Sequence, residues 1–127
     1  MKVRVGAVDR WASGYHVSFV SPFGSGHAFW SGDVPVLGRE YCVEIGCADR
    51  FVWGENICPV KCKRYAIRQQ NGCLRLAGLL ESIDGDGTAA IRLLDDLIYI
   101  RVKGMTARPG AWVELRVSDV TLHDAQV

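Results

Sequence analysis

Apolar and polar residues alternate along most of this chain, and this two-residue period limits the possible fold more than any other feature. Near the N-terminus, Val3 and Val5 alternate with Lys2 and Arg4. Successive side chains of a β-strand point to opposite faces, so each such run places one apolar face on a core. The same pattern returns at residues 15–19, 41–45, 89–93, 98–102 and 113–117. Runs with the helical period are nearly missing, and we therefore predict an all-β protein.

Residues that favour tight turns separate the predicted strands. They include Gly14, the SPFGSG run at 21–26, the SGD run at 31–33 and the corner at 108–110. Gly supplies the positive φ, and Pro the fixed φ, that hairpins and loops require. Strands at this spacing predict a small barrel or sandwich of about 9–10 short antiparallel strands, built as one unit or as two OB-like or duplicated β units.

The chain is long enough to form one compact domain with its own core. A weak internal repeat is visible, because Val3–Gly6 is similar to Leu74–Gly78 and Val43–Ile45 is similar to Val113–Leu115. Either a true duplication or the common pattern of two β-meanders explains this repeat. We predict a single domain over 1–127, which can be divided into β units at 1–57 and 72–124 joined by a basic connecting segment at 58–71.

Charge and hydropathy narrow the classes of partner and the location. With 15 basic and 14 acidic side chains, the formal charge of +1 gives no long-range field that would attract polyanions. The first residues contain no apolar core of signal-peptide length, and no window is apolar enough for a membrane helix. We therefore expect a cytoplasmic protein with no membrane partner, in which the five cysteines are reduced thiols.

The SIDGDGTA segment at 82–89 looks like the start of a calcium loop. Two aspartates and Thr88 occupy the first oxygen-ligand positions, but Ala89 and Asp95 stand where such a loop requires Gly and Glu. An Asp-Gly pair between alternating apolar runs is instead typical of a β-hairpin. We predict a turn at this segment, and we expect no cofactor.

Four of the cysteines have a spacing that permits a tetrahedral zinc site. Cys58 and Cys62 would form the second ligand pair, after Cys42 and Cys47. The compact two-residue spacing of a zinc knuckle is missing, and free Cys commonly serves as a small buried apolar residue. We predict no metal site, with zinc on these four cysteines as the alternative.

The sequence shows no recognisable catalytic arrangement. His16, His27 and His123 are scattered over predicted strands and the C-terminal segment, and no nucleophile elbow precedes a helix. Asp95 and Asp96 are neighbours on a predicted strand, so their carboxylates point to opposite faces and do not act on one bond. We expect a protein without enzymatic activity, and an enzyme with an unrecognised site remains the alternative.

Aromatic and basic residues in loops and at strand ends are the candidate binding groups. Exposed rings together with Arg can form a protein interface or a platform for stacked bases. Packing of most of these rings in the core, with Arg stacked over them, is the alternative. The predicted binding residues, for protein or nucleic acid, are Trp30, Arg39, Trp53, Lys61, Lys63, Arg64, Tyr65, Arg68 and Trp112.

Four segments form a further pattern, namely GREYCVEI at 38–45, WGENI at 53–57, LAGLLE at 76–81 and AIRL at 90–93. With this pattern the chain resembles small uncharacterised bacterial all-β proteins, some of which serve as immunity partners of secreted toxins. The resemblance implies a cytoplasmic protein that binds and neutralises a partner. It transfers no active residue to this sequence.

Two functions are consistent with these features. We expect a non-enzymatic module that binds another protein through loop residues, and an immunity-type inhibitor of a bacterial toxin is the case that the resemblance implies. The alternative is an OB-like protein that binds single-stranded nucleic acid along the basic side chains of 61–75, including Arg75. The nearly neutral total charge ranks this alternative second.

Overall fold

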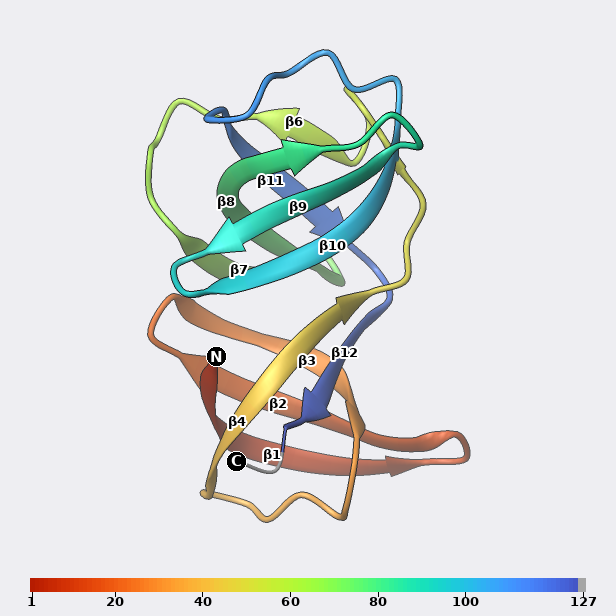
Figure 1. The fold of residues 1–127 in the computed structure, drawn as a ribbon. Helices are drawn as coiled ribbons and strands as arrows, with labels where there is room; N and C mark the ends of the chain where they lie inside the picture. Colours follow the sequence, from red (N-terminus) through yellow and green to blue (C-terminus); the bar gives the residue numbers. More distant parts are fainter. Residues whose placement is uncertain (126–127) are drawn as a thin grey trace.

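A computed structural model describes residues 1–125, which form strands, turns and loops and contain no helix. The strands join into one twelve-stranded sheet that curls around the core (Figure 1). Their bounds are β1 Lys2–Trp11, β2 Gly14–Ser21, β3 Gly24–Ser31, β4 Glu40–Cys47, β5 Phe51–Val52, β6 Ile57–Pro59, β7 Ala66–Gln70, β8 Cys73–Ile83, β9 Thr88–Leu93, β10 Asp96–Lys103, β11 Trp112–Val117 and β12 Val120–Asp124. The all-β prediction is confirmed. The strands outnumber those predicted because β5 and β6 are too short to show alternation.

Five strands close into a barrel, which occupies the lower half of Figure 1. Strands β1, β2 and β3 follow one another as antiparallel neighbours, and β4 pairs with the start of β1. The C-terminal strand β12 completes the circuit, because it pairs antiparallel with β4 and parallel with β3. The barrel therefore combines strands from both ends of the chain.

The remaining strands form a second unit around the long strand β8. Along its length β8 pairs with β7, β11 and β9, and β9 continues into β10 as a hairpin. Strand β5 lies parallel to the end of β10, and β6 lies antiparallel to β11. Between β5 and β6 the circuit is completed by one isolated bridge, Trp53 to Ile57. This second circuit is therefore held much more weakly than the barrel at its point of closure.

The strands that make up each unit differ from those expected from the sequence-based division at residues 57 and 72. Strands β5 and β6 precede or overlap that first boundary and yet pair with β10 and β11, while β12 returns to the barrel. Strand β7 joins the units directly, since the Ile67 amide donates to the carbonyl of Phe23 (2.9 Å). At Gly24 a Cβ atom would overlap the Ile67 carbonyl, so only Gly permits this approach. The units are interleaved along the chain.

The alternating apolar residues form one continuous core that extends through both units. Val5 and Phe19 belong to the barrel, while Leu76 and Leu115 belong to the second unit, and all four are at most 1% exposed. Such burial is the main favourable contribution to folding. The continuity of the core indicates that the units support each other.

Residues 84–87 form a tight turn between β8 and β9, as predicted for the segment at 82–89. The Asp84 amide donates to the carbonyl of Thr88 (2.8 Å), and the Gly87 amide donates to the carbonyl of Asp84 (3.1 Å). Gly87 has a φ of 89°, and the Asp86 carboxylate accepts the Thr88 amide hydrogen at 3.0 Å. Asp86 thus uses its carboxylate to support the turn.

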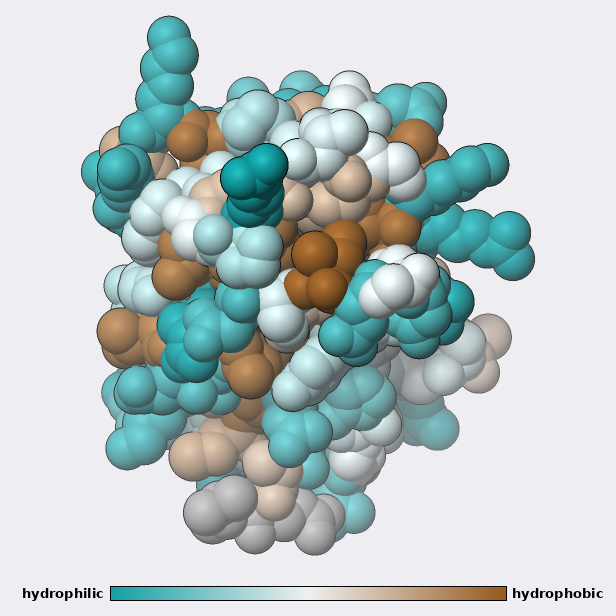
Figure 2. All heavy atoms as spheres, turned by 45° about the horizontal axis from the view of Figure 1, so that its top comes forward, coloured by the Kyte–Doolittle hydropathy of each residue, from teal (hydrophilic) through white to brown (hydrophobic). Residues whose placement is uncertain are grey.

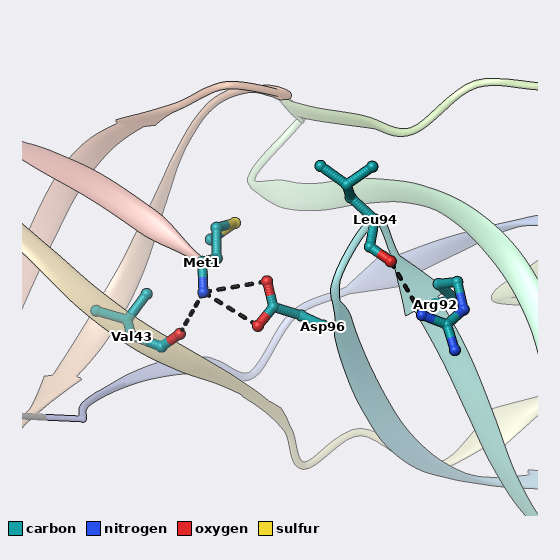
Figure 3. Close-up of polar contacts among 5 residues, drawn as sticks. All are labelled: Met1, Val43, Arg92, Leu94 and Asp96. Carbon is teal, nitrogen blue, oxygen red and sulfur yellow. Dashed lines mark hydrogen bonds and ion pairs between the residues drawn. The ribbon is translucent and has the colours of Figure 1, made fainter. Parts of the chain in front are cut away.

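The N-terminal amine links the barrel to the second unit (Figure 3). It donates to the carbonyl of Val43 on β4 (3.0 Å) and forms an ion pair with Asp96 on β10 (3.1 Å). The Met1 side chain is only 1% exposed. Nearby, the Arg92 guanidinium donates to the carbonyl of Leu94 (3.1 Å), which fixes the turn before β10.

Candidate binding site

The loop between β3 and β4 presents three aliphatic side chains to solvent. Val34 is 60% exposed, Val36 is 51% exposed and Leu37 is 65% exposed. Together with Arg39 they define what we call the loop surface. On the face shown in Figure 2, by contrast, apolar residues lie in separate groups among hydrophilic ones.

Side chains of the barrel hold the backbone of this loop in place. The Trp30 indole N–H donates to the carbonyl of Asp33 (2.8 Å), and the Val36 amide donates to the Tyr41 hydroxyl (2.8 Å). The rings of Trp30 and Tyr41 meet edge to face, with centroids 4.8 Å apart. The Gly38 amide donates to the carbonyl of Val5 (2.8 Å). The loop is therefore fixed at both of its ends.

Arginine side chains add polar groups around the loop. The Arg39 guanidinium lies over the Tyr41 ring, 5.5 Å from its centroid, in a cation–π arrangement. Arg4 donates to the carbonyl of Gly38 (3.1 Å) and to the Glu40 carboxylate (2.8 Å). A polar border around exposed apolar groups is typical of a protein interface.

An open pocket of about 620 Å³ lies between the loop and β4. Val34, Arg39 and Tyr41 line it together with Lys2 and Asp33. The pocket combines an aromatic wall with charges of both signs, so it can accept a polar or charged side chain from a partner. Two of the predicted binding residues, Arg39 and the supporting Trp30, belong to this region.

The other predicted residues lie on the second unit. Lys61, Lys63 and Arg64 are exposed in the loop between β6 and β7. The Tyr65 ring that follows them packs against Trp112, with centroids 5.0 Å apart. Residues 61–65 form what we call the basic loop.

Two further cations of the predicted nucleic-acid track have acidic partners. Arg75 donates to the Glu114 carboxylate (3.0 Å), and Arg68 forms an ion pair with the same carboxylate (3.6 Å). Each of these arginines is partly neutralised by an acid that lies far away in the sequence. A continuous phosphate track from the basic loop along β7 and β8 is therefore interrupted at Glu114.

Two predicted binding residues contribute mainly to packing. Trp30 is only 6% exposed, and the half-buried Trp53 packs against the core. These two rings therefore show the alternative arrangement, namely packing in or beside the core. Trp30 still affects the loop surface, because its indole N–H orients the loop backbone.

Sequence reasoning did not identify a stack of rings on the outer face of β1–β3. Trp11 and His16 are stacked with centroids 4.8 Å apart, His16 and His27 are stacked at 6.0 Å, and Phe29 meets His16 edge to face. Burial, followed by the nearby His27, lowers the pKa of His16, while Asp9 acts in the opposite direction. The sequence contains these rings at outward-facing positions of neighbouring strands. Only the strand register shows that they lie side by side.

Neither the cysteines nor the histidines form a metal site in the part of the chain that the structure describes, where no group of three or more His, Cys, Asp and Glu side chains is placed to hold an ion. Cys42 and Cys47 lie on β4, whereas Cys58 lies on β6 of the second unit and Cys62 follows it. Burial, with help from two nearby aspartates, raises the pKa of the Cys47 thiol to about 12. This thiol therefore stays protonated and is a poor nucleophile at neutral pH.

Comparison with known protein families, with curated proteins and with solved structures finds no match. Across residues 1–125 there is no helix of the length and hydropathy needed to span a bilayer. The interpretation of the site therefore depends on its geometry.

Proposed function

We propose that this protein is a non-enzymatic module that binds another protein through the loop surface. The observation that carries this proposal is the exposure of Val34, Val36 and Leu37 on one loop whose backbone is held by hydrogen bonds. Exposed aliphatic groups that share a border of polar residues mark protein contact sites. Because the loop is already ordered, binding would cost little additional conformational entropy.

An inhibitor of the toxin-immunity type is the specific form of this proposal that the sequence resemblance favours. Such a protein blocks its target by occupying a surface, and it needs no reacting group of its own. Arg39 supports this reading, since a guanidinium beside apolar side chains can anchor a carboxylate of the partner. Cytoplasmic location belongs to the same proposal.

A site-specific crosslinker tests the proposed surface. We would place a photoreactive amino acid at Leu37 and, as a matched control, at Val20, which is also an exposed aliphatic residue at 56%. We expect a stoichiometric protein adduct from position 37 and none from position 20. The captured partner is then purified, and its affinity for the Val34→Asp/Leu37→Asp variant is measured.

The double variant should weaken that complex at least about 100-fold, because two buried contacts would each be replaced by an unpaired charge. The Val20→Asp variant should bind as the original protein does. Unchanged affinity of the double variant, with its fold confirmed by circular dichroism, would remove the loop surface as the binding site.

Binding of single-stranded nucleic acid is the second candidate, and one observation favours it. Lys61, Lys63 and Arg64 are exposed beside the Tyr65 and Trp112 rings, which is a combination suited to phosphates and stacked bases. A titration with single-stranded DNA and RNA at low salt tests it, with the charge-reversed K61E/K63E/R64E variant as control. Affinity that falls steeply with salt and is lost in the variant would support this OB-like function.

A further inference from the structure

Two strands of different units face each other across a groove without pairing. Strand β4 of the barrel and strand β10 of the second unit lie on the same side of the molecule and approach each other there (Figure 1). No hydrogen-bonded ladder joins them in the described chain. The groove between them has a volume of about 440 Å³ and includes Ile45, Leu97 and Tyr99 in its lining.

The edge of β10 is open over its first half. The Val102 amide donates to the carbonyl of Gly87 (2.8 Å), on the side of β10 that pairs with β9. Backbone direction alternates along a strand, so Leu97 and Tyr99 direct their N–H and C=O groups to the opposite side. Strand β5 covers that side only at Val102 and Lys103. Within residues 1–125 the peptide groups of Leu97 and Tyr99 therefore have no strand partner.

The facing edge of β4 is open as well. The Val43 amide donates to the Met1 carbonyl (2.8 Å), and the Val43 carbonyl accepts from the Met1 amine (3.0 Å). By the same alternation Ile45 and Cys47 face this side. Strand β1 begins at Lys2 and covers β4 only as far as this contact. The groove thus lies between two rows of peptide groups that strand pairing leaves available.

The side chains around the groove are apolar and acidic. Tyr99 is 64% exposed and Leu97 is 37% exposed, and both stand beside the open edge. Glu44 and Asp95 are exposed acids in the lining, and the Met1 amine, a cationic group that also lies there, is paired with Asp96. A negatively charged groove favours a positively charged occupant and repels nucleic acid.

We propose that this groove binds an extended basic segment of another protein, which adds as a strand to the edge of β10 at Leu97 and Tyr99. The peptide groups of the segment satisfy the open N–H and C=O groups, as in other cases of strand addition. The apolar side chains of the segment point to the core face, beside Ile45, and the Lys or Arg side chains between them point outward, to the face of Glu44 and Tyr99. A second copy of this chain would bring the same acidic edge to the groove, so like charges oppose that occupant.

This site is separate from the loop surface, and its test uses a defined probe. A short fluorescein-labelled peptide of alternating Lys and Val, with blocked termini, is titrated at low salt and followed by anisotropy. We expect saturable binding, with amide NMR shifts at Ile45, Leu97 and Tyr99. A peptide of alternating Glu and Val should not bind. The Lys-Val peptide with N-methyl groups on alternate amides should also not bind, because it lacks the donors that pair with the edge.

Protein variants distinguish this site from other acidic surfaces. The Glu44→Lys/Asp95→Lys variant should bind the Lys-Val peptide about tenfold more weakly, because two attractive charges become repulsive. Glu55→Lys is the matched control, since Glu55 is an exposed acid outside the groove, and its affinity should be unchanged. Tyr99→Pro removes one open donor at an edge position, and we expect it to fold and to lose the peptide.

Several results would overturn the proposal. These are failure of the Lys-Val peptide to bind, full affinity in the Glu44→Lys/Asp95→Lys variant, amide shifts confined to another edge, and a dimer in analytical ultracentrifugation that Tyr99→Pro abolishes. If Tyr99→Pro does not fold, the charge-reversed variant still decides the outcome. The Val34→Asp/Leu37→Asp variant should retain the peptide, so failure of the loop surface and failure of the groove are observed separately.

Discussion

The barrel and the second unit are built from similar alternating strands, but they close differently. The barrel closes through ladders, the last of them formed by β12 with β3 and β4. The second unit closes through two very short strands and the single bridge from Trp53 to Ile57. Where strands are short, the neighbouring edge stays open, as it does on β10. Similar patterning thus gives a rigid scaffold in one unit and an unpaired edge in the other.

Removal of a core ring should affect both units, and this is the largest effect that we expect. Phe19 in the barrel and Phe51 in the second unit are each 1% exposed and belong to one core. Phe19→Ala or Phe51→Ala should lower the free energy of unfolding by about 3–5 kcal/mol, through lost burial and the cavity left behind. Urea denaturation measures this change.

Hydrogen exchange of the same two variants separates a shared core from two independent ones. With a shared core, Phe51→Ala accelerates exchange of the slowest amides in β1–β3 as well as in β8–β10. Acceleration restricted to β8–β10 would show that the weakly closed unit unfolds alone. In that case the continuous core would not couple the unfolding of the two units.

The contact between β3 and β7 at the junction of the units depends on one glycine. Gly24 has a φ of 136°, and a Cβ atom there would overlap the Ile67 carbonyl of β7. Gly24→Ala should destabilise the protein by about 3 kcal/mol, since backbone strain and overpacking act together. Thermal or urea denaturation measures the change.

Gly14→Ala is the control for this junction. Gly14 has a similar φ of 131°, but nothing lies within 4 Å of its added Cβ. Its substitution should cost only about 1–2 kcal/mol, because strain acts alone. Equal effects at the two glycines would mean that β7 moves away from β3 without cost, and the contact between units would then be incidental.

Local pattern was enough to predict the strands but not the way in which they close. Val113, Leu115 and Val117 alternate in the sequence, and all are buried on β11. The return of β12 to the barrel depends on contacts between distant parts of the chain, which no local period encodes. The strands β5 and β6 are shorter than the window over which a period can be recognised.

The candidate site was harder to predict than the fold for a similar reason. The loop residues Val34, Val36 and Leu37 surround a Pro and have no strand period, so nothing in the sequence shows that they stay exposed. The Glu114 carboxylate, which lies on another strand, forms ion pairs with both Arg68 and Arg75. Pairing of charges and exposure of loops are both tertiary properties, and they decide which predicted residues remain available to a partner.

The smallest expected effects are the pH responses of the two units. In the barrel, burial and the neighbouring His27 lower the pKa of His16 from its ordinary value near 6.5. In the second unit, the hydrogen bonds from Arg92 lower the pKa of the Glu81 carboxyl from about 4.5. Each group therefore binds a proton more readily in the unfolded chain than in the folded one.

Stability falls with decreasing pH in both cases, but over different ranges. The contribution of His16 is complete above pH 6.5 and is lost as the pH falls through its lower folded pKa, whereas that of Glu81 is lost only below about pH 4.5. Urea midpoints are measured from neutral to acidic pH. Their dependence on pH should become weaker just below pH 6.5 in His16→Gln, and only at the acid end in Glu81→Gln. Each variant serves as the control for the other. If His16→Gln kept the full slope just below pH 6.5, burial beside His27 would not lower the pKa of His16 in the folded protein.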